Sequence, residues 1–315
     1  MESNTSPTTP PRNCKCYMRN LQPGSDNKII QYKVKYSDFI DDFIKEDVIN
    51  IDTTVYDEHD DTISMYNTKD FKYIPINYMD AQTGMNPIMR AFLIDWLINA
   101  HRFLFLEHRT LYLATNIIDR FLSKAVVAKQ RFGLLAISAL FLASKYEEVT
   151  QPLLDDFLKI TKYRCQRHDV IIMESIILQI INFDLGTISS CDYLNHYFEN
   201  HECSNLQKHI ADYLSVLSLM DYDQIAFKPS DIACSCILLA KSITNCDKSR
   251  DVLYVFKKTE SELEMCTNAI SHYLKEISSQ KRNNMTKPLL SAIRKYEGDD
   301  TLYAVKVCAE YVCKI

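Results

Sequence analysis

The stretch MRAFLIDWL, residues 89–97, has apolar side chains at helical spacing on two faces. The residues at i, i+3, i+4 and i+7 share one face: Met89, Phe92, Leu93 and Trp96. A second apolar face is formed by Ala91, Ile94, Leu97 and Ile98. A single apolar face is sufficient for packing, so this helix is either central and wholly buried or carries an exposed docking surface.

The helix around this stretch is the first of a series. Asn86 is a suitable cap and Pro87 fits a first turn, so the helix is expected over 87–103. The apolar periodicity predicts four more helices, over 109–123, 129–146, 152–161 and 166–181. A second set of five is predicted over 189–201, 205–220, 229–242, 249–256 and 260–279. The third helix of each set is apolar and rich in small residues (ISALFLASKY at 137–146, DIACSCILLAKS at 231–242), which indicates one five-helix unit used twice.

Composition agrees with an all-α fold in about two domains. The 315 residues include only 5 glycines and 9 prolines, and four of the prolines fall within the first 23 residues. This scarcity of turn-formers argues against a sandwich, a barrel or a glycine-rich nucleotide fold. Residues 1–36 are polar and proline-bearing and predict a disordered tail. Residues 37–71 predict a short amphipathic helix, starting near Tyr36 and ending at Val48, followed by an acidic loop.

Charge and cysteine usage exclude several classes of partner. The net charge of −5 is uneven: residues 1–36 carry +4, residues 37–70 carry −9 and the remainder is neutral. No basic face for nucleic acid is therefore expected. The longest uncharged run, 132–144, is too short to span a bilayer, so no membrane partner is expected either. Eleven cysteines without a CxxC pair predict reduced thiols in an intracellular protein.

Sequence signatures of catalysis and metal binding are missing. The chain has no GxGxxG, GxxxxGK[ST], GxSxG or HExxH motif. The nearest approach to a metal cluster is Cys191, His196, His201 and Cys203, whose spacing matches no standard zinc site. We therefore expect no catalytic residues, no cofactor and no metal.

Four isolated charges interrupt the apolar helices. Arg90 and Asp119 each stand alone in such a run, and a charge there is rarely buried unless it is paired. We therefore predict a largely buried ion pair between them, although both could instead lie solvated at helix edges. Lys145 and Glu174 could form an internal salt bridge or could point at a partner protein. Periodicity does not distinguish these two roles.

Four blocks in order over about 100 residues resemble the cyclin box: MRAFLIDWL, LYLATNIIDRFLS, LFLASKYEE and MESIILQIINFDL. The segment LSLMDYDQIAFKPSDIACSCILLA in the second half resembles the second cyclin fold of B-type, mitotic cyclins, and 292–296 resembles its closing signature. The resemblance covers roughly residues 72–297. It implies two tandem five-helix cyclin folds, an N-terminal one over 72–186 and a C-terminal one over 187–315.

The resemblance also implies a function, that of a non-catalytic regulatory subunit of a cyclin-dependent serine/threonine kinase. The first fold would pack on the kinase αC helix and turn it inward, so that the kinase's own lysine–glutamate pair can form. By alignment the kinase-binding residues are Lys145, Tyr146, Glu174, Leu178 and Phe183. Met89, Phe92, Leu93 and Trp96 match the patch that docks basic-hydrophobic motifs of substrates or inhibitors. Arg90 and Asp119 match the family's internal ion pair.

Two positions depart from the family pattern near the docking patch. Asn99 stands where an acidic residue usually follows the patch, and Gly133 stands where glutamine is usual, beside the apolar Phe132. Charge selection by the patch is therefore expected to be weak. The tail shows no clear destruction box, whereas Ser6 and Thr9, each followed by proline, fit sites for proline-directed kinases.

The sequence therefore predicts an activator of a cyclin-dependent kinase that acts at the G2/M transition, in the nucleus and the cytoplasm. A transcription-associated cyclin is one alternative. A general transcription factor of the same fold that binds nucleic acid is another, which the neutral body of the chain disfavours. A scaffold that has lost kinase activation is a third, which the presence of Lys145 and Glu174 disfavours.

Overall fold

The computed structural model describes the backbone of 17–19 and 29–31 and residues 65–66, 73–162, 164–246, 249–282, 289–298, 301 and 303–313. Most of the predicted tail and acidic loop lies outside these residues, as do the expected helix over 36–48 and the candidate phosphosites Ser6 and Thr9. Among the described residues, no helix is both long and apolar enough to cross a membrane.

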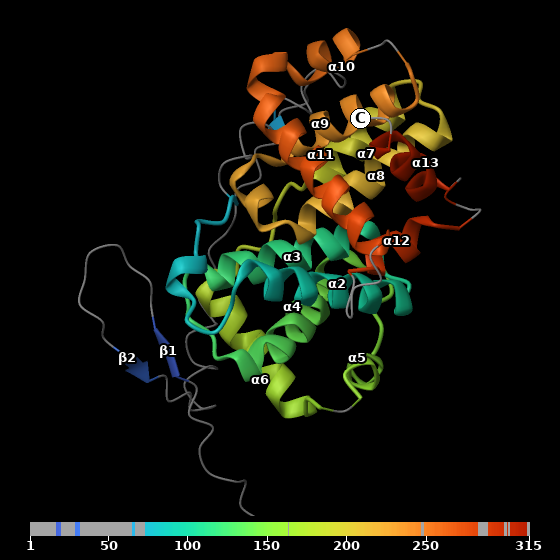
Figure 1. Cartoon of the computed structure of the whole chain (residues 1–315). Coiled ribbons are helices and arrows are strands. Elements are labelled where there is room, and N and C mark those ends of the chain that lie inside the picture. The colour runs from blue at the N-terminus through green and yellow to red at the C-terminus, as the bar shows by residue number, and fades with distance from the viewer. Residues whose placement is uncertain are drawn as a thin grey trace, which may run out of the picture.

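The first domain is a bundle of five helices, one of which is central and is surrounded by the other four (Figure 1). Its helices are α2 (Pro87–Phe103), α3 (His108–Leu122), α4 (Phe132–Glu147), α5 (Leu154–Ile160) and α6 (Arg167–Ile180). Helix α4 packs against all four others. Every residue from Leu135 to Ser144 is buried, as expected for a helix that is apolar all round.

The second domain repeats this arrangement. Its helices are α7 (Ser190–Asn200), α8 (Asn205–Met220), α9 (Pro229–Ile243), α10 (Ser249–Phe256) and α11 (Glu260–Arg282). Helix α9, the counterpart of α4, packs against the other four. The prediction of a five-helix unit used twice is therefore confirmed, and the small residues of both central helices allow close approach from all sides.

Local signals in the sequence set several helix ends. Asn86 caps α2 by accepting a hydrogen bond from the Met89 amide at 2.8 Å, and Pro87 occupies its first turn, as predicted. The helix predicted over 129–146 is split into a 3₁₀ turn, η3 (Lys129–Arg131), and α4. The split falls where polar residues give way to the apolar run, since only the apolar run can be buried.

Two helices at the carboxyl end were not predicted. Helix α12 (Ser291–Tyr296) packs on α2 of the first domain and α8 of the second, and α13 (Ala304–Val312) packs on α8 and α11 (Figure 1). Short 3₁₀ helices η2 (Met79–Ala81) and η4 (Tyr222–Ala226) lie ahead of α2 and α9. The C-terminal segment therefore bridges the domains.

A small sheet lies within the segment predicted as a tail. Strands β1 (Tyr17–Arg19) and β2 (Ile29–Gln31) pair antiparallel, with Met18 opposite Ile30. Tyrosine and isoleucine favour extended backbone, a local preference that the overall polar composition of this segment conceals.

Candidate functional site

Lys145 and Glu174 meet on the surface of the first domain. Lys145 lies in the last turn of α4 and Glu174 at the middle of α6, and these helices pack together. Lys145 Nζ donates to Glu174 Oε1 at 2.6 Å and lies 4.3 Å from the centre of the Phe141 ring. The Lys145 side chain is 37% exposed and that of Glu174 11%. The pair is therefore an intramolecular salt bridge with one open side.

Apolar side chains lie at the ends of the same two helices. Tyr146 follows Lys145 and is 53% exposed, and Phe183 is 51% exposed just beyond α6, whereas Leu178 is half-buried. Backbone geometry holds Phe183 in place: its amide donates to the Leu178 carbonyl at 2.8 Å. Asn182 and Phe183 both adopt left-handed φ angles, of 57° and 56°. Such backbone strain costs on the order of 1–3 kcal/mol per residue and occurs often at functional sites.

The predicted docking patch lies along one side of α2. Phe92 is 39% exposed, and Met89, Leu93 and Trp96 are partly buried against the core. The opposite face of α2 is fully packed, with Ile94, Leu97 and Ile98 at 0% exposure. The helix therefore uses one apolar face for the core and presents the other at the surface.

The two departures near the patch have structural consequences. Asn99 is exposed one turn beyond Trp96. A Cβ atom added at Gly133 would meet nothing within 4 Å, so the start of α4 presents open surface where a longer side chain is usual. The apolar neighbour Phe132 is only 6% exposed and belongs to the core.

Arg90 and Asp119 form a buried pair between α2 and α3. Arg90 Nη2 lies 2.6 Å from Asp119 Oδ2 and Nε lies 2.8 Å from Oδ1, with the Arg90 side chain only 1% exposed. Burial alone would lower the pKa of the Arg90 guanidinium, but Asp119 outweighs burial and raises it overall. Arg90 therefore stays charged in the core.

The Arg90 pair also joins the two domains, which the sequence interpretation missed. Arg90 Nη1 donates to the Leu219 carbonyl of α8 at 2.9 Å. Tyr78 donates from its hydroxyl to Asp119 Oδ1 at 2.6 Å. The Tyr222 hydroxyl accepts from the amides of Tyr78 and Met79, each at 2.9 Å. Tyr222 lies in the segment that resembles the second cyclin fold, between Asp221 and Asp223, and this acidic turn is the sequence signal that marks it.

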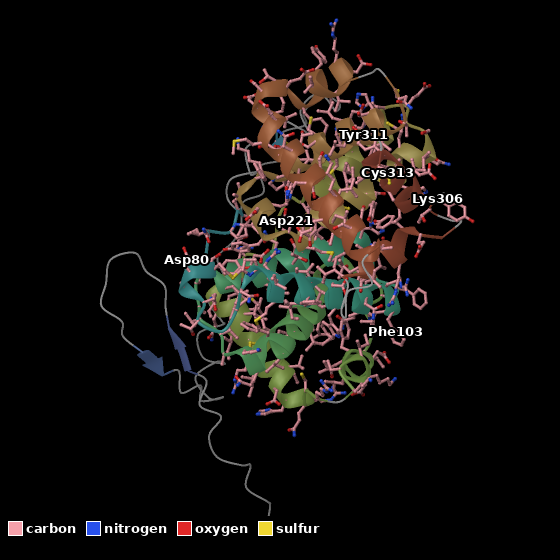
Figure 2. The ribbon with its side chains drawn as sticks, viewed as in Figure 1. Asp80, Phe103, Asp221, Lys306, Tyr311 and Cys313 are labelled. Atoms are coloured by element: carbon pink, nitrogen blue, oxygen red, sulfur yellow. The ribbon has the colours of Figure 1, made fainter. Side chains whose placement is uncertain are left out.

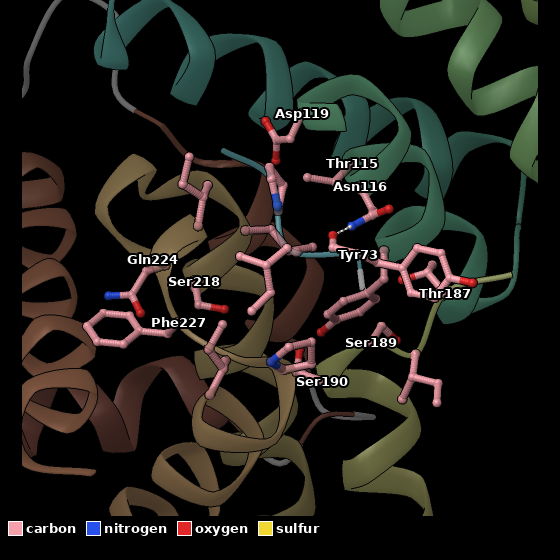
Figure 3. A pocket seen from close by; sticks show the side chains of 18 of the residues that line it. Tyr73, Thr115, Asn116, Asp119, Thr187, Ser189, Ser190, Ser218, Gln224 and Phe227 are labelled. Carbon is pink, nitrogen blue, oxygen red and sulfur yellow. Dashed lines mark hydrogen bonds between the residues drawn. The ribbon is translucent and has the colours of Figure 1, made fainter. Parts of the chain in front are cut away.

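A cavity of about 100 Å³ lies at the junction beside this pair (Figure 3). Asn116 Nδ2 donates to the Tyr73 carbonyl at 2.9 Å across one wall, and Ser218, Gln224 and Phe227 line another. The volume is sufficient for a few water molecules rather than for a cofactor. In the described part of the chain, Gln224 Oε1 and Asn116 Oδ1 are buried without a hydrogen-bond partner, so ordered water is the occupant that suits this cavity.

Three of the four residues nearest to a metal-site pattern are buried or engaged in ring contacts. Cys191 is buried in α7, where burial raises the pKa of its thiol to about 12. His201 stacks on Tyr197 with 4.5 Å between ring centres, and His196 lies edge-on to Tyr66. Across the described residues, no three histidine, cysteine or acidic side chains converge in a way that could hold a metal ion.

A cluster of buried and half-buried titratable groups lies where α12 meets both domains. Burial lowers the pKa of His101 to about 3 and of His108 to about 4, with the charge of Lys295 as a further cause. Burial also raises the pKa of Asp212 to about 6 and lowers that of Lys295 to about 8. His101 Nε2 lies 2.8 Å from the Glu107 carbonyl, so it carries the proton of the neutral ring.

Comparisons with known proteins agree with this geometry. The cyclin N-terminal domain family matches residues 61–186 and the cyclin C-terminal domain family matches residues 188–307. Cyclin-B2-2 of Arabidopsis thaliana is 36% identical over 174 residues, which are 55% of this chain and 41% of that protein. The putative cyclin-A3-1 of the same plant is 39% identical over 174 residues, 53% of this chain and 49% of that protein.

The chain spans about half the length of the curated relatives it matches. Among solved structures, a viral cyclin from herpesvirus saimiri superposes with a TM-score of 0.60 at 14% identity, covering 67% of this chain and 95% of that one. At this identity the likeness establishes the fold only. Together with the two matched domains, it shows that the chain belongs to the cyclin family, with a cyclin N-terminal domain followed by a cyclin C-terminal domain.

Proposed function

We propose that this chain binds and activates a cyclin-dependent serine/threonine kinase as the non-catalytic subunit of a heterodimer. The observation that carries the proposal is the half-open Lys145–Glu174 pair, flanked by the exposed rings of Tyr146 and Phe183. In the cyclin family this surface packs on the kinase αC helix. Contacts within the chain hold Lys145 against Glu174 and the Phe183 amide against the Leu178 carbonyl.

The chemistry of the pair suits the exposed backbone and charges of a partner helix. An ammonium group has three donors, and Glu174 occupies one of those of Lys145. Burial of Tyr146 and Phe183 against the kinase would contribute roughly 25 cal/mol per Å² of apolar surface. The cyclin would shift the kinase toward its active conformation only by the difference in affinity for the two states.

The test is a double substitution of Lys145→Ala and Glu174→Ala. Kinase recovered by pulldown and kinase activity should both fall, while the thermal midpoint of the free chain stays nearly unchanged, because partly exposed ion pairs contribute about 0–1 kcal/mol. The matched control removes the exposed Lys159–Asp156 pair of α5 and should leave both properties intact. A large fall in the midpoint of the first variant would mark the pair as structural and contradict the proposal.

We further propose a role at mitotic entry, with the protein in the nucleus and the cytoplasm. The turn at 221–223 and the helix at 89–97 support it, since both resemble mitotic cyclins, although relatives of both A and B type match at similar identity. Mass spectrometry of the co-purified kinase, together with the arrest stage after depletion, tests the assignment. Recovery of a transcription-associated kinase alone would refute the mitotic role and retain the kinase role.

Two secondary proposals follow. The patch of Met89, Phe92, Leu93 and Trp96 docks short apolar motifs, so Trp96→Ala should reduce phosphorylation of docking protein substrates more than that of a short peptide. Equal loss on both substrates would reject docking.

Ser6 and Thr9 are proposed phosphosites of the tail, which phosphopeptide mapping of the kinase complex checks.

A further inference from the structure

The exposed face of α2 is longer than the four-residue patch. Ile88 and Phe103 are 66% and 65% exposed and continue the face at either end. With 100° per residue these side chains lie on one side of the helix together with Asn99. We call this face the α2 stripe, which consists of Ile88, Met89, Phe92, Leu93, Trp96, Asn99 and Phe103. Figure 2 shows Phe103 at the surface of the first domain.

The single acidic side chain of α2, that of Asp95, bonds to α12 and not to the surface of the stripe. Asp95 lies at the edge of the stripe, and its two carboxylate oxygens accept from the amide and the hydroxyl of Ser291, each at 2.8 Å. The carboxylate therefore caps α12. Arg294 of the same short helix is exposed and close enough to act on Asp95 electrostatically.

Three cations of the described residues lie near α2: Arg102 and Arg294 at the edge that Asp95 shares, and Lys129 near the amino end. Arg102 lies on the same edge as Asp95, is exposed, and donates from Nη1 to the Arg294 carbonyl at 3.1 Å. Lys129 is exposed near the amino end of α2. Its Cβ would lie 3.7 Å from a Cβ atom added at Gly84, which stands two residues before the cap residue of α2. The amino end of α2 adds a partial positive charge. Glu297, exposed just beyond α12, is the nearest acid in sequence to these groups.

From this arrangement we infer that the α2 stripe docks peptide segments whose apolar anchors are flanked by acidic residues, and that it discriminates against basic ones. The inference rests on the docking role proposed above and specifies its ligand. Lys129, Arg102 and Arg294 would face the acidic flanks, while the neutral Asn99 and the engaged Asp95 offer little to a basic flank. Asn99 and Gly133 together predicted weak charge selection, and the positions of these three cations give the selection a sign.

The experiment measures fluorescence anisotropy of three labelled synthetic peptides with the purified full chain. The peptides share the same leucine and phenylalanine anchors and differ only in aspartate, asparagine or lysine at the flanks. We expect the acidic peptide to bind about tenfold more tightly than the basic one, a difference of about 1.4 kcal/mol. Raising the salt concentration from about 50 to about 300 mM should reduce this difference, because exposed charges are screened.

Three variants locate the interaction. Trp96→Ala should abolish binding of all three peptides, and Arg102→Glu with Arg294→Glu should reverse their order. Asn99→Asp, at an exposed position, should move the preference toward the basic peptide and is expected to fold normally. The matched control is Arg167→Glu on α6, which removes an exposed cation whose partner is Asp155 and should leave the order unchanged.

Equal or tighter binding of the basic peptide by the unaltered chain would overturn the inference, as would acidic-peptide binding that survives Trp96→Ala. A dimer of this chain that dissociates on Trp96→Ala, measured by light scattering, would identify a second copy as the occupant and would also overturn it. These assays require no kinase. A chain that activates a kinase but prefers the basic peptide would refute only this inference, whereas one that prefers the acidic peptide but activates no kinase would refute only the proposed function.

Discussion

Arg90 of the first domain donates from Nη1 to the backbone carbonyl of Leu219 in the second domain at 2.9 Å, while the rest of its guanidinium is held by Asp119. One side chain therefore serves both the core of one domain and the junction between the two. Arg90→Ala should lower the free energy of unfolding by about 3–5 kcal/mol, because Asp119 is left charged and buried.

Denaturant unfolding followed by circular dichroism checks this prediction. The control is Arg167→Ala, which removes an exposed pair whose side chains are each 57% exposed and should change stability by less than about 1 kcal/mol. Equal effects of the two substitutions would show that burial of the Arg90 pair has no energetic consequence.

Tyr222→Phe removes a single hydroxyl at the domain junction. That hydroxyl accepts from two backbone amides and donates to Asn77 Oδ1 at 2.7 Å. Loss of the acceptor should destabilise the chain by about 1–2 kcal/mol, because the Tyr78 amide loses its acceptor and the Met79 amide keeps only its longer bond of 3.4 Å to Asn77 Oδ1. Thermal unfolding measures the effect, with Tyr254→Phe as the control because Tyr254 is 84% exposed. A similar midpoint for both variants would count against the role of Tyr222.

The buried histidines predict that stability falls with decreasing pH. His101 and His108 have folded-state pKa values of about 3 and about 4, against an ordinary value of 6.5, because burial disfavours their charged forms. Between the folded-state and the ordinary pKa values, the unfolded chain binds more protons than the folded chain. The free energy of unfolding therefore decreases as pH falls, by up to about 1.4 kcal/mol per pH unit for each histidine.

Asp212 opposes this trend below pH 6. Its folded-state pKa is raised to about 6, so the folded chain takes up a proton there that the unfolded chain does not. Near pH 5.5 the slope that these three groups contribute together should therefore equal that of about one histidine. Urea titrations between about pH 7.5 and pH 5 measure it. The double variant His101→Gln with His108→Gln should lose this decrease in stability with falling pH. The control His168→Gln, at an exposed position, should keep it. An unchanged slope in the double variant would refute the assignment.

Ser291→Ala should loosen α12 from the first domain. The substitution removes the hydroxyl that donates to Asp95 Oδ2 at 2.8 Å and leaves the amide bond to Oδ1. We expect a loss of about 1–2 kcal/mol, because a hydrogen bond to a carboxylate is stronger than a neutral one. Hydrogen exchange of the α12 amides should accelerate, whereas Ser279→Ala on α11, whose hydroxyl bonds within its own helix, should leave them unaffected. Unaltered exchange in Ser291→Ala would argue that packing alone holds α12.

The repeated bundle could be predicted from the sequence because its determinants are local. Asn86 and Pro87 define the start of α2, and the uninterrupted apolar run of α4 requires burial on all sides. The pairing of Arg90 with Asp119 followed from the rarity of lone buried charges. These inferences needed only side-chain spacing and the free energy of burying a charge.

The rest depends on how the two domains meet. Tyr222 bonds to residues 143 and 144 positions earlier in the chain, and no periodicity relates them. That Lys145 and Glu174 form an internal salt bridge depends on the distance between α4 and α6, which side-chain spacing does not give. Helix α12 is six residues long, too short for a periodic signal, and its amino end is capped by a side chain from the other domain.

The bond between Asp95 and Ser291 joins residues 196 positions apart. During synthesis α2 leaves the ribosome long before the segment that caps against it, so the carboxylate of Asp95 and the ring of His101 stay uncovered until the segment around Ser291 has emerged. Contacts of such long sequence separation slow folding. A premature stop codon before Ser291 would accordingly damage the amino-terminal domain, although every residue of that domain would have been translated.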